Sequence, residues 1–231
     1  MNEASKTRKL LRPEEMELLC GKGIDIGCGN DPVNPECQRF DVDDGDANSI
    51  TNHISELESY DYVFSAHCLE HMYKPSETIQ DWWKLVKPGG VLVVIVPDED
   101  LYEQGYWPSL FNPDHKATFT LGKQKSWSPV SHNLFELAQA LPQGELLSAR
   151  LQDNHFDRKR LCHTTWSAKN VEKFSAFRFN YYVLNKWYKD WADRLFFFLQ
   201  IPVDQTLGRA SAQNLIIVKK TQSSLETVSG G

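Results

Sequence analysis

The sequence predicts an α/β fold with an open, mostly parallel sheet, because strand and helix patterns alternate along it. Residues 24–26 are a short β-branched run that stops at glycines, which is typical of a strand entering a tight turn. Residues 91–96 form a continuous apolar run, as expected for a parallel strand buried on both faces. Apolar residues in 78–86 recur at roughly helical spacing, which predicts a helix packed on the sheet.

Length, charge and cysteine usage narrow the class of protein. The 231 residues suit one α/β domain with a large core. The formal net charge of −6 gives no overall electrostatic support to a nucleic-acid partner or an anionic membrane. The five cysteines form no C-x-x-C pair, so we expect reduced thiols and a cytoplasmic location. The longest apolar run near the end, 195–199, is too short to cross a bilayer, and we expect no membrane span.

The segments around the first strand follow in order. Residues 1–12 are polar and basic and are expected to be a frayed lead-in, and Pro13 then begins a short helix. Between the strand 24–26 and the predicted second strand, 37–42, little room is left for a crossover. A parallel crossover needs a dozen or more residues, and two prolines interrupt this stretch, so we expect a shortened helix or a loop.

The glycine turn after the first strand is the first candidate ligand site. Gly27 and Gly29 allow positive φ and close approach of a ligand to the backbone. In an open α/β sheet, this turn is where ligands bind. The third glycine of a dinucleotide site is missing, and Asp31 would repel a phosphate, so a cationic ligand without phosphates suits the turn better. Asp25, acidic within the strand, either orients the turn or meets a cationic part of the ligand.

Acidic residues end the predicted second strand. A carboxylate at this place hydrogen-bonds ribose hydroxyls in this architecture, and Asp41 and Asp43 compete for that role. The alternative is that residues 43–46 are only a solvated acidic loop.

Several segments together resemble the class I S-adenosylmethionine-dependent methyltransferases. Residues 22–31 resemble motif I of that family, and residues 46–48 resemble its next motif, whose Asp meets the adenine amino group. Residues 60–98 resemble the family pattern in order and spacing, with the Leu-Glu-His triplet at 69–71 and the Lys-Pro-Gly-Gly segment at 87–90. The second pattern is much more specific than the glycine turn alone.

The resemblance implies a Rossmann-like, doubly wound, mostly parallel seven-stranded sheet. Its last strand, 213–218, would be antiparallel, and an aromatic-rich insertion of helix and loop would follow the fifth strand. Residues 1–220 would form one domain, with a cofactor half at about 20–98 and an acceptor part at about 99–212. The Ser- and Gly-rich residues 221–231 are expected to be a disordered tail.

The implied cofactor is S-adenosylmethionine, with S-adenosylhomocysteine as the product. Carried over residue by residue, the resemblance implies that the cofactor meets Asp25, Gly27, Cys28, Gly29, Asp41, Asp43, Asp46, Ala47, Ser65, Ala66, Glu70 and His71.

A metal site is the competing interpretation of one segment. His67, Glu70 and His71 match the inverted zinc-protease pattern, with both histidines on one helical face. That pattern requires a helix and a third ligand downstream. Here it directly follows a predicted strand, and no downstream acidic motif stands out, so we expect no metal.

Methyl transfer from a sulfonium is an in-line displacement, in which the protein mainly positions the nucleophile and excludes water. A hydroxyl acceptor must also lose its proton, which calls for a base. Beyond the cofactor half, the candidate bases are His115, His132, Asp153, His155 and His163. His115 and His155 are preferred, because they follow loop or strand patterns where the acceptor would lie.

The predicted activity is methyl transfer to a small-molecule or saccharide acceptor, with oxygen as the preferred atom. Two alternatives remain open: N- or C-methylation of a small metabolite, and a non-catalytic cofactor-binding subunit that acts through a partner interface. Aromatic and apolar residues at helical spacing in 183–198 predict a core or dimer-facing helix, so a homodimer is possible there.

Overall fold

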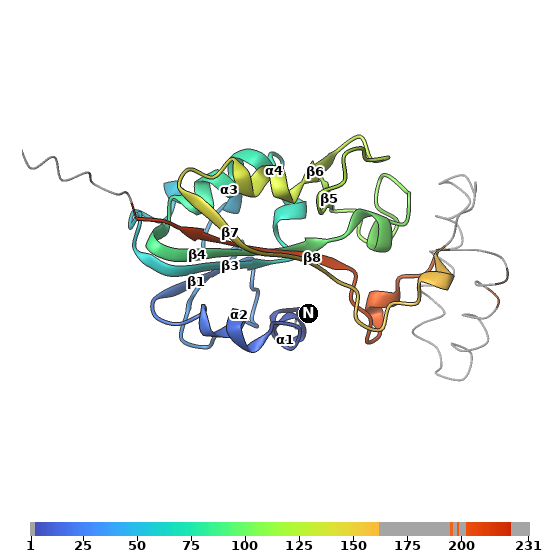
Figure 1. Ribbon diagram of the computed structural model, residues 1–231, viewed down its shortest axis with the longest axis horizontal. Helices are drawn as coiled ribbons and strands as arrows, with labels where there is room; N and C mark the ends of the chain where they lie inside the picture. Colours follow the sequence, from blue (N-terminus) through green and yellow to red (C-terminus); the bar gives the residue numbers. More distant parts are fainter. Residues whose placement is uncertain (1–2, 162–194, 196–197, 199–201, 223–231) are drawn as a thin grey trace, which may run out of the picture.

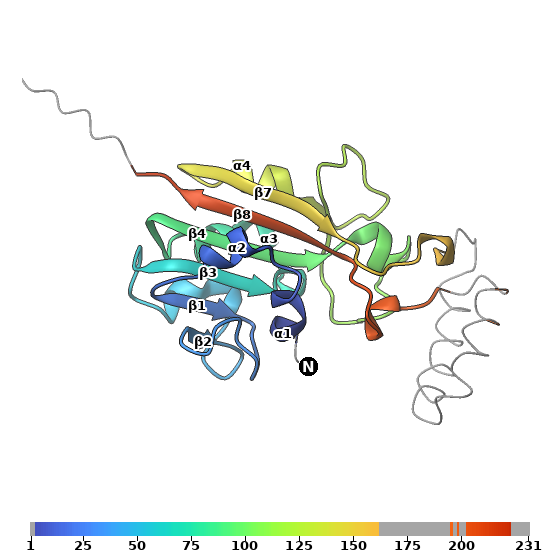
Figure 2. The same ribbon diagram turned by 60° about the horizontal axis from the view of Figure 1, so that its bottom comes forward.

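The computed structural model describes residues 3–161, 195, 198 and 202–222. A six-stranded sheet with the order β2-β1-β3-β4-β8-β7 forms the centre of the described part (Figures 1 and 2). The strand β8 runs antiparallel to both of its neighbours, β4 and β7, so the antiparallel last strand is confirmed. The strands are β1 (Gly23–Ile26), β2 (Gln38–Phe40), β3 (Tyr60–Ala66), β4 (Val86–Pro97), β7 (Gly144–Gln152) and β8 (Gln213–Lys220).

Helices cover both faces of the sheet. Figure 1 shows α3 (Pro75–Trp83) and α4 (Leu134–Gln139) on one face, and α1 (Glu3–Arg8) and α2 (Pro13–Glu17) on the other. In β4, Leu92, Val94 and Val96 belong to the core cluster that contains α3 and α4 side chains. Their neighbours Val91, Val93 and Ile95 belong to the cluster on the α2 side. Side chains alternate across a strand, so the apolar run is buried on both faces as predicted.

The sheet has six strands among the described residues, and the expected seventh is not present there. The segment between β2 and β3 forms a 3-10 helix, η1 (Ala47–Asn52), in place of a strand. The Asp46 side chain accepts a hydrogen bond from the Asn48 backbone N–H and so caps the helix. Thr51 on η1 donates to Asp81 on α3, so this segment packs on a helix and pairs with no strand.

The crossover from β1 to β2 contains no helix, as the short spacing predicted. The frayed lead-in was a wrong prediction, because residues 3–8 form α1. This helix is tied down by hydrogen bonds from the Ser5 backbone N–H and hydroxyl to Asp31, and from Lys6 Nζ to the Thr206 carbonyl. The order of α1 therefore depends on hydrogen bonds to residues far away in the sequence. A local sequence pattern does not show such bonds.

The segment after β4 leads to the edge of the sheet at which the parallel strands end. It contains the π-helical turn η3 (Glu99–Glu103) and a two-stranded sheet of β5 (Thr118–Thr120) and β6 (Ser131–Asn133). Figure 2 shows the arrowheads of β1, β3 and β4 at that same edge. Three further 3-10 turns are η2 (Leu69–His71), η4 (Arg158–Arg160) and η5 (Gln205–Leu207).

Two predictions concern segments that lie mostly outside the described residues. The dimer-facing helix at 183–198 lies outside the described residues except for positions 195 and 198, and the tail does so from 223 onward. Within the described ranges, no helix combines the length and the apolar character that a bilayer crossing requires.

Candidate active site

Two adjoining cavities lie where β1, β2, β3 and β4 end. The glycine-turn cavity has a volume of about 640 Å³ and is lined by Gly27, Asp41, Asp46, Ala47, His67, Cys68, His71 and neighbouring residues. The Tyr102 cavity has a volume of about 370 Å³ and is lined by His67, Glu70, His71, Tyr102, Phe111, His115 and neighbouring residues. His67 and His71 line both, so the two cavities meet at these rings.

The glycine turn forms the base of the first cavity. Gly27 adopts φ 79°, and an added Cβ would lie 2.6 Å from the Cβ and Sγ atoms of Cys68. Any side chain at position 27 would therefore clash with Cys68, the residue that precedes η2. Gly29 adopts φ 57°, and its added Cβ would meet nothing within 4 Å. Glycine is favoured at position 29 because of the positive φ and not because of a steric clash, since the space beside it is open.

Asp41 and Asp43, which the sequence left as alternatives, lie in different surroundings. Asp41 lines the glycine-turn cavity, and its Oδ2 accepts a hydrogen bond of 2.5 Å from the Gly29 backbone N–H. Its Oδ1 accepts another, of 2.7 Å, from the Val42 N–H. Asp43 is exposed and does not line either cavity. The carboxylate of Asp41 thus couples the glycine turn to the end of β2.

Asp25 is buried within β1 and does not line either cavity. Its Oδ2 accepts a hydrogen bond of 2.6 Å from the Val33 backbone N–H, which fixes the loop after the turn. Burial, together with the negative charges of Asp31 and Asp41, raises the pKa of Asp25 to about 7. Of the two roles predicted for this residue, the structure shows the orientation of the loop.

The remaining predicted cofactor residues divide between the cavities and the core. Asp46 and Ala47 line the glycine-turn cavity. Ser65 is buried and donates a hydrogen bond to the Ile26 carbonyl. Cys28, Ser65 and Ala66 do not line either cavity.

Glu70 has unusual surroundings in the Tyr102 cavity. It is 1% exposed, and neither carboxylate oxygen has a hydrogen-bond partner among the described residues. Three imidazole nitrogens face Oε1 instead: His67 Nδ1 at 3.5 Å, His71 Nε2 at 4.0 Å and His115 Nε2 at 4.0 Å. Burial raises the pKa of Glu70, whereas the neighbouring imidazoles, His67 foremost, lower it when they carry a proton on both nitrogens, and the net shift of the pKa is downward.

Two of these imidazole rings are each oriented by a carboxylate that contacts the Nδ1 atom. Glu103 Oε1 lies 2.7 Å from His115 Nδ1, and both side chains are buried. Asp114 Oδ2 lies 2.9 Å from His71 Nδ1. An ionised carboxylate only accepts hydrogen bonds, so Nδ1 carries the proton in both rings and each Nε2 faces Glu70. The ring of Tyr102 lies 5.4 Å from that of His115, between centroids, and covers it.

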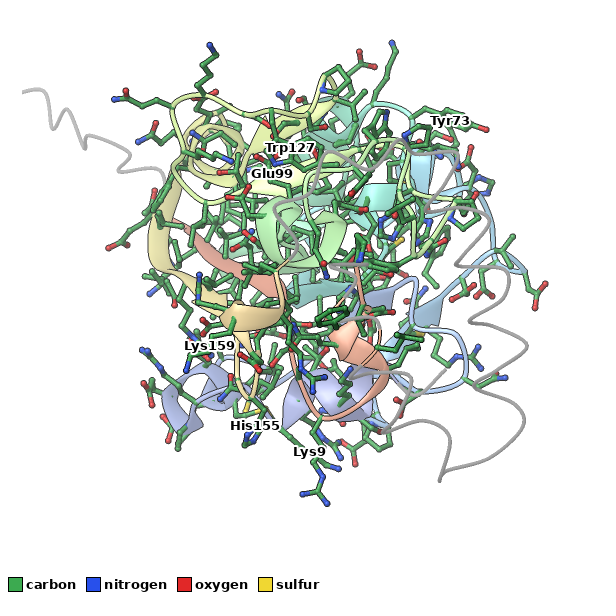
Figure 3. All side chains as sticks on the ribbon, turned by 90° about the vertical axis from the view of Figure 1, so that its right-hand side faces the viewer. Lys9, Tyr73, Glu99, Trp127, His155 and Lys159 are labelled. Atoms are coloured by element: carbon green, nitrogen blue, oxygen red, sulfur yellow. The ribbon has the colours of Figure 1, made fainter. Side chains whose placement is uncertain are left out.

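The two preferred candidate bases lie far apart. His115 lies in the Tyr102 cavity beside Glu70, as described above. His155 lies in an exposed turn after β7, adopts φ 59° and does not line either cavity. Figure 3 shows His155 at the lower edge of the molecule, well separated from Tyr73, which follows η2. Among the other candidates, His163 lies outside the described residues.

Sequence reasoning missed the groups that orient His115 and His71. Glu103 on η3 carries no local signal, because it acts on a histidine twelve positions away across a turn. Asp114 is adjacent to His115 in sequence yet bonds to His71, which only the folded chain reveals. His67 appears in the H-x-x-E-H pattern, and that pattern was the available clue to the cluster around Glu70.

An open α/β sheet with two joined cavities at the carboxyl ends of its parallel strands is the architecture of Rossmann-like proteins, which bind their ligands at that edge. The model of the methyltransferase-domain family matches residues 4–141, which is more than half of the chain. The chain therefore belongs to the methyltransferase-domain family, and its cofactor is S-adenosylmethionine.

Comparison with solved structures finds similarity at low sequence identity, and the first structure below, with a TM-score above 0.5, shares the fold. A putative methyltransferase from Bacillus halodurans C-125 is 14% identical, with a TM-score of 0.53 over 93% of this chain and 98% of that chain. A methyltransferase from Archaeoglobus fulgidus is 14% identical, with a TM-score of 0.48 over 94% of each chain. Phosphoethanolamine N-methyltransferase 2 of Haemonchus contortus is 12% identical, with a TM-score of 0.46 over 87% of this chain. The chain covers only 49% of that enzyme. No curated protein matches the sequence.

Proposed function

We propose that the chain transfers the methyl group of S-adenosylmethionine to a hydroxyl of a small-molecule or saccharide acceptor. The observation that supports this most directly is the junction of the two cavities at His67 and His71. A donor in one cavity and an acceptor in the other would face each other across these rings. The 370 Å³ of the Tyr102 cavity is within the usual range for a small ligand.

In this proposal the glycine-turn cavity holds the cofactor. Asp41 accepts hydrogen bonds from the ribose hydroxyls at the end of β2, and Asp46 with Ala47 meets the adenine ring. The sulfonium end then points toward His67 and His71, where the cavities join. Asp43 takes no part, since it lies outside the cavity.

His115 is the proposed base. Glu103 holds the Nδ1 proton of His115, which leaves the Nε2 lone pair facing the cavity. As the hydroxyl oxygen attacks the methyl carbon, its proton passes to Nε2. The carbon–sulfur bond breaks, and its electron pair remains on sulfur, which gives neutral S-adenosylhomocysteine. The buried Glu103 carboxylate stabilises the imidazolium that forms.

Aromatic side chains support a ring-shaped acceptor. Tyr102 and Phe111 line the cavity with their ring centroids 5.7 Å apart, nearly perpendicular to each other. Asn112 and Asp204 add polar groups to the same wall. An apolar wall with a few polar groups suits a sugar or an aromatic alcohol.

The test is an acceptor panel assayed for S-adenosylhomocysteine. Phenols, catechols and monosaccharides are compared with amines and with carbon nucleophiles, using wild-type protein. We expect methylation of a hydroxyl compound. Methylation of amines or carbon nucleophiles alone contradicts the oxygen assignment. Tight S-adenosylmethionine binding with no methylated acceptor favours the non-catalytic subunit.

A further inference from the structure

We propose that Glu70, His71 and His115 bind a divalent transition-metal ion where the two cavities meet. No metal was expected from the sequence, because the zinc-protease pattern needs both histidines on one helix. The structure offers a different ligand set. Glu70 and His71 lie on the 3-10 turn η2, and His115 comes from the segment after η3.

The distances suit a bound cation better than direct hydrogen bonds. One ligand atom from each of the three residues lies within 4.8 Å of the others. Glu70 Oε1 is 4.0 Å from both His71 Nε2 and His115 Nε2. A charged hydrogen bond would need about 2.7–2.9 Å. An ion bound at about 2.1 Å to both atoms separates them by roughly 3.4 Å at a tetrahedral angle and by about 4.2 Å when linear.

The orientation of the rings is that of metal-bound histidines. Asp114 fixes His71 through Nδ1, and Glu103 fixes His115 in the same way. Both partners are carboxylates, and a carboxylate oxygen accepts a hydrogen bond from an imidazole N–H. Ligating histidines almost always donate their other N–H to such a carboxylate or carbonyl group. Both Nε2 atoms therefore point their lone pairs at the same place.

Glu70 gives the second, independent observation. A carboxylate that is 1% exposed and has no hydrogen-bond partner among the described residues is costly to bury unless a cation accompanies it. A metal ion that binds this oxygen removes the cost. His67 Nδ1, 3.5 Å from the same oxygen, is a further nitrogen within reach of the ion.

The donor set decides the class of metal. Two imidazole nitrogens and one carboxylate oxygen favour Zn²⁺, Mn²⁺, Fe²⁺ or Co²⁺ over Mg²⁺ and Ca²⁺, which prefer oxygen ligands. Three protein ligands leave at least one coordination position for an acceptor atom in the Tyr102 cavity.

The role of the ion rests on the proposed function. Glu70, His71 and His115 would hold the ion, which as a Lewis acid would lower the pKa of a bound acceptor hydroxyl so that water could take its proton. His115 Nε2 would then be a ligand and would not itself accept the proton.

The test uses the full-length protein, stripped with a chelator and titrated with Co²⁺ or Zn²⁺. Co²⁺ is followed by its visible absorption and Zn²⁺ by calorimetry, and elemental analysis gives the stoichiometry. We expect one ion per chain. Glu70→Gln and His71→Gln should weaken binding by more than about 100-fold, and Glu103→Gln by roughly 10–100-fold as an outer-shell partner.

His155→Asn is the matched control, because it removes an exposed histidine outside both cavities and Asn tolerates its positive φ. It should leave metal affinity unchanged. Thermal melts establish that each variant folds. A folded, stripped wild type that takes up no ion overturns the proposal, as does a metal affinity equal to wild type in folded Glu70→Gln and His71→Gln.

Failure of the metal site and failure of the proposed function give different results. If stripped protein binds no metal yet methylates a hydroxyl at the full rate, the metal site is wrong and the function stands. If metal binding depends on Glu70 and His71 but only amines are methylated, the site stands and the oxygen acceptor is wrong.

Discussion

Glu99 and Glu70 are both 1% exposed, yet their surroundings differ completely. Hydroxyl groups of three residues donate to Glu99 Oε2, at distances from 2.5 to 3.2 Å, and Lys123 Nζ lies 3.1 Å from Oε1; the three are Thr118, Ser126 and Ser131. Figure 3 shows Glu99 near Trp127. Glu70 has no hydrogen-bond partner among the described residues and faces three imidazoles at 3.5–4.0 Å.

The difference separates a carboxylate whose partners lie within the fold from one that we propose binds a ligand. Glu99 links η3 to β5, β6 and the loop between them, so its charge is fully used within the protein. The surroundings of Glu70 leave its oxygens available to something outside the chain. Among the buried side chains of the described residues, Glu70 is the one whose two carboxylate oxygens both lack a hydrogen-bond partner, and such an exception calls for an explanation.

The largest expected effect is on activity at the Glu70 cluster. His115→Ala should lower turnover by roughly 10²–10⁴-fold, because it removes the group proposed to help ionise the acceptor. Affinity for S-adenosylmethionine should stay close to wild type, since His115 does not line the glycine-turn cavity. Steady-state kinetics and calorimetry measure the two quantities. His155→Asn serves as the control, and equal turnover in both variants contradicts the placement of the base.

For the free energy of unfolding, we expect the larger loss at Glu99 and the smaller loss at Glu70. Glu99→Ala leaves three hydroxyls and an ammonium without their carboxylate and should cost roughly 3–5 kcal/mol of unfolding free energy. Glu70→Ala breaks no hydrogen bond and removes a buried charge, so its cost in chelator-treated protein should stay below about 2 kcal/mol. Urea denaturation of both variants measures the difference. Equal losses would show that Glu70 is as structural as Glu99.

Asp25 lies between these extremes, with one hydrogen bond and a pKa raised to about 7. The unfolded chain loses this proton near pH 4, and the native state keeps it until about pH 7. The unfolded state therefore binds fewer protons in that window, and stability falls as pH rises from about 4 to 7. The decline is on the order of 4 kcal/mol at most.

Asp25→Asn should remove this decline, because Asn still accepts from Val33 and carries no charge. Urea denaturation at several pH values compares it with wild type and with Asp43→Asn, an exposed control. A pH slope in Asp25→Asn that equals the wild-type slope contradicts the assignment of the raised pKa.

A smaller effect should separate Asp41 from Asp43 in cofactor binding. Losing a charged acceptor costs roughly 1.5–3 kcal/mol per hydrogen bond. Asp41→Asn should therefore weaken S-adenosylmethionine binding about tenfold or more, and Asp43→Asn should change it little. Calorimetry decides between them. If neither substitution matters, the acidic segment is only a solvated loop.

The smallest expected effect concerns the glycine turn. Gly29→Ala and Gly89→Ala both place a Cβ in open space at positive φ, 57° and 88°. Both should lower stability to a similar extent, by about 1 kcal/mol. Only Gly29→Ala should weaken cofactor binding, by roughly tenfold, because its methyl group enters the ligand side of the turn. An equal loss of affinity in Gly89→Ala would point to backbone strain as the cause.

The sequence by itself determined the local features of this protein. The strands β1 and β4 follow from the β-branched and apolar patterns of their residues, which depend on neighbouring residues only. The antiparallel direction of β8 followed from the family resemblance. The resemblance at residues 60–98 led correctly to the methyltransferase family. Among the described residues the expected seventh strand is not present, and the segment between β2 and β3 forms η1, where Thr51 donates a hydrogen bond to Asp81, thirty positions away. No local pattern shows such a contact.

Tertiary structure alone decided which charged groups meet. The sequence offered Asp41 and Asp43 as equals, and the turn that follows β2 directs only Asp41 to the cavity. It likewise offered His115 and His155 as equals, and the chain path separates them. The isolation of Glu70 also appears only in the fold, because the solvation and partners of a side chain depend on contacts between distant segments. No local pattern records those contacts.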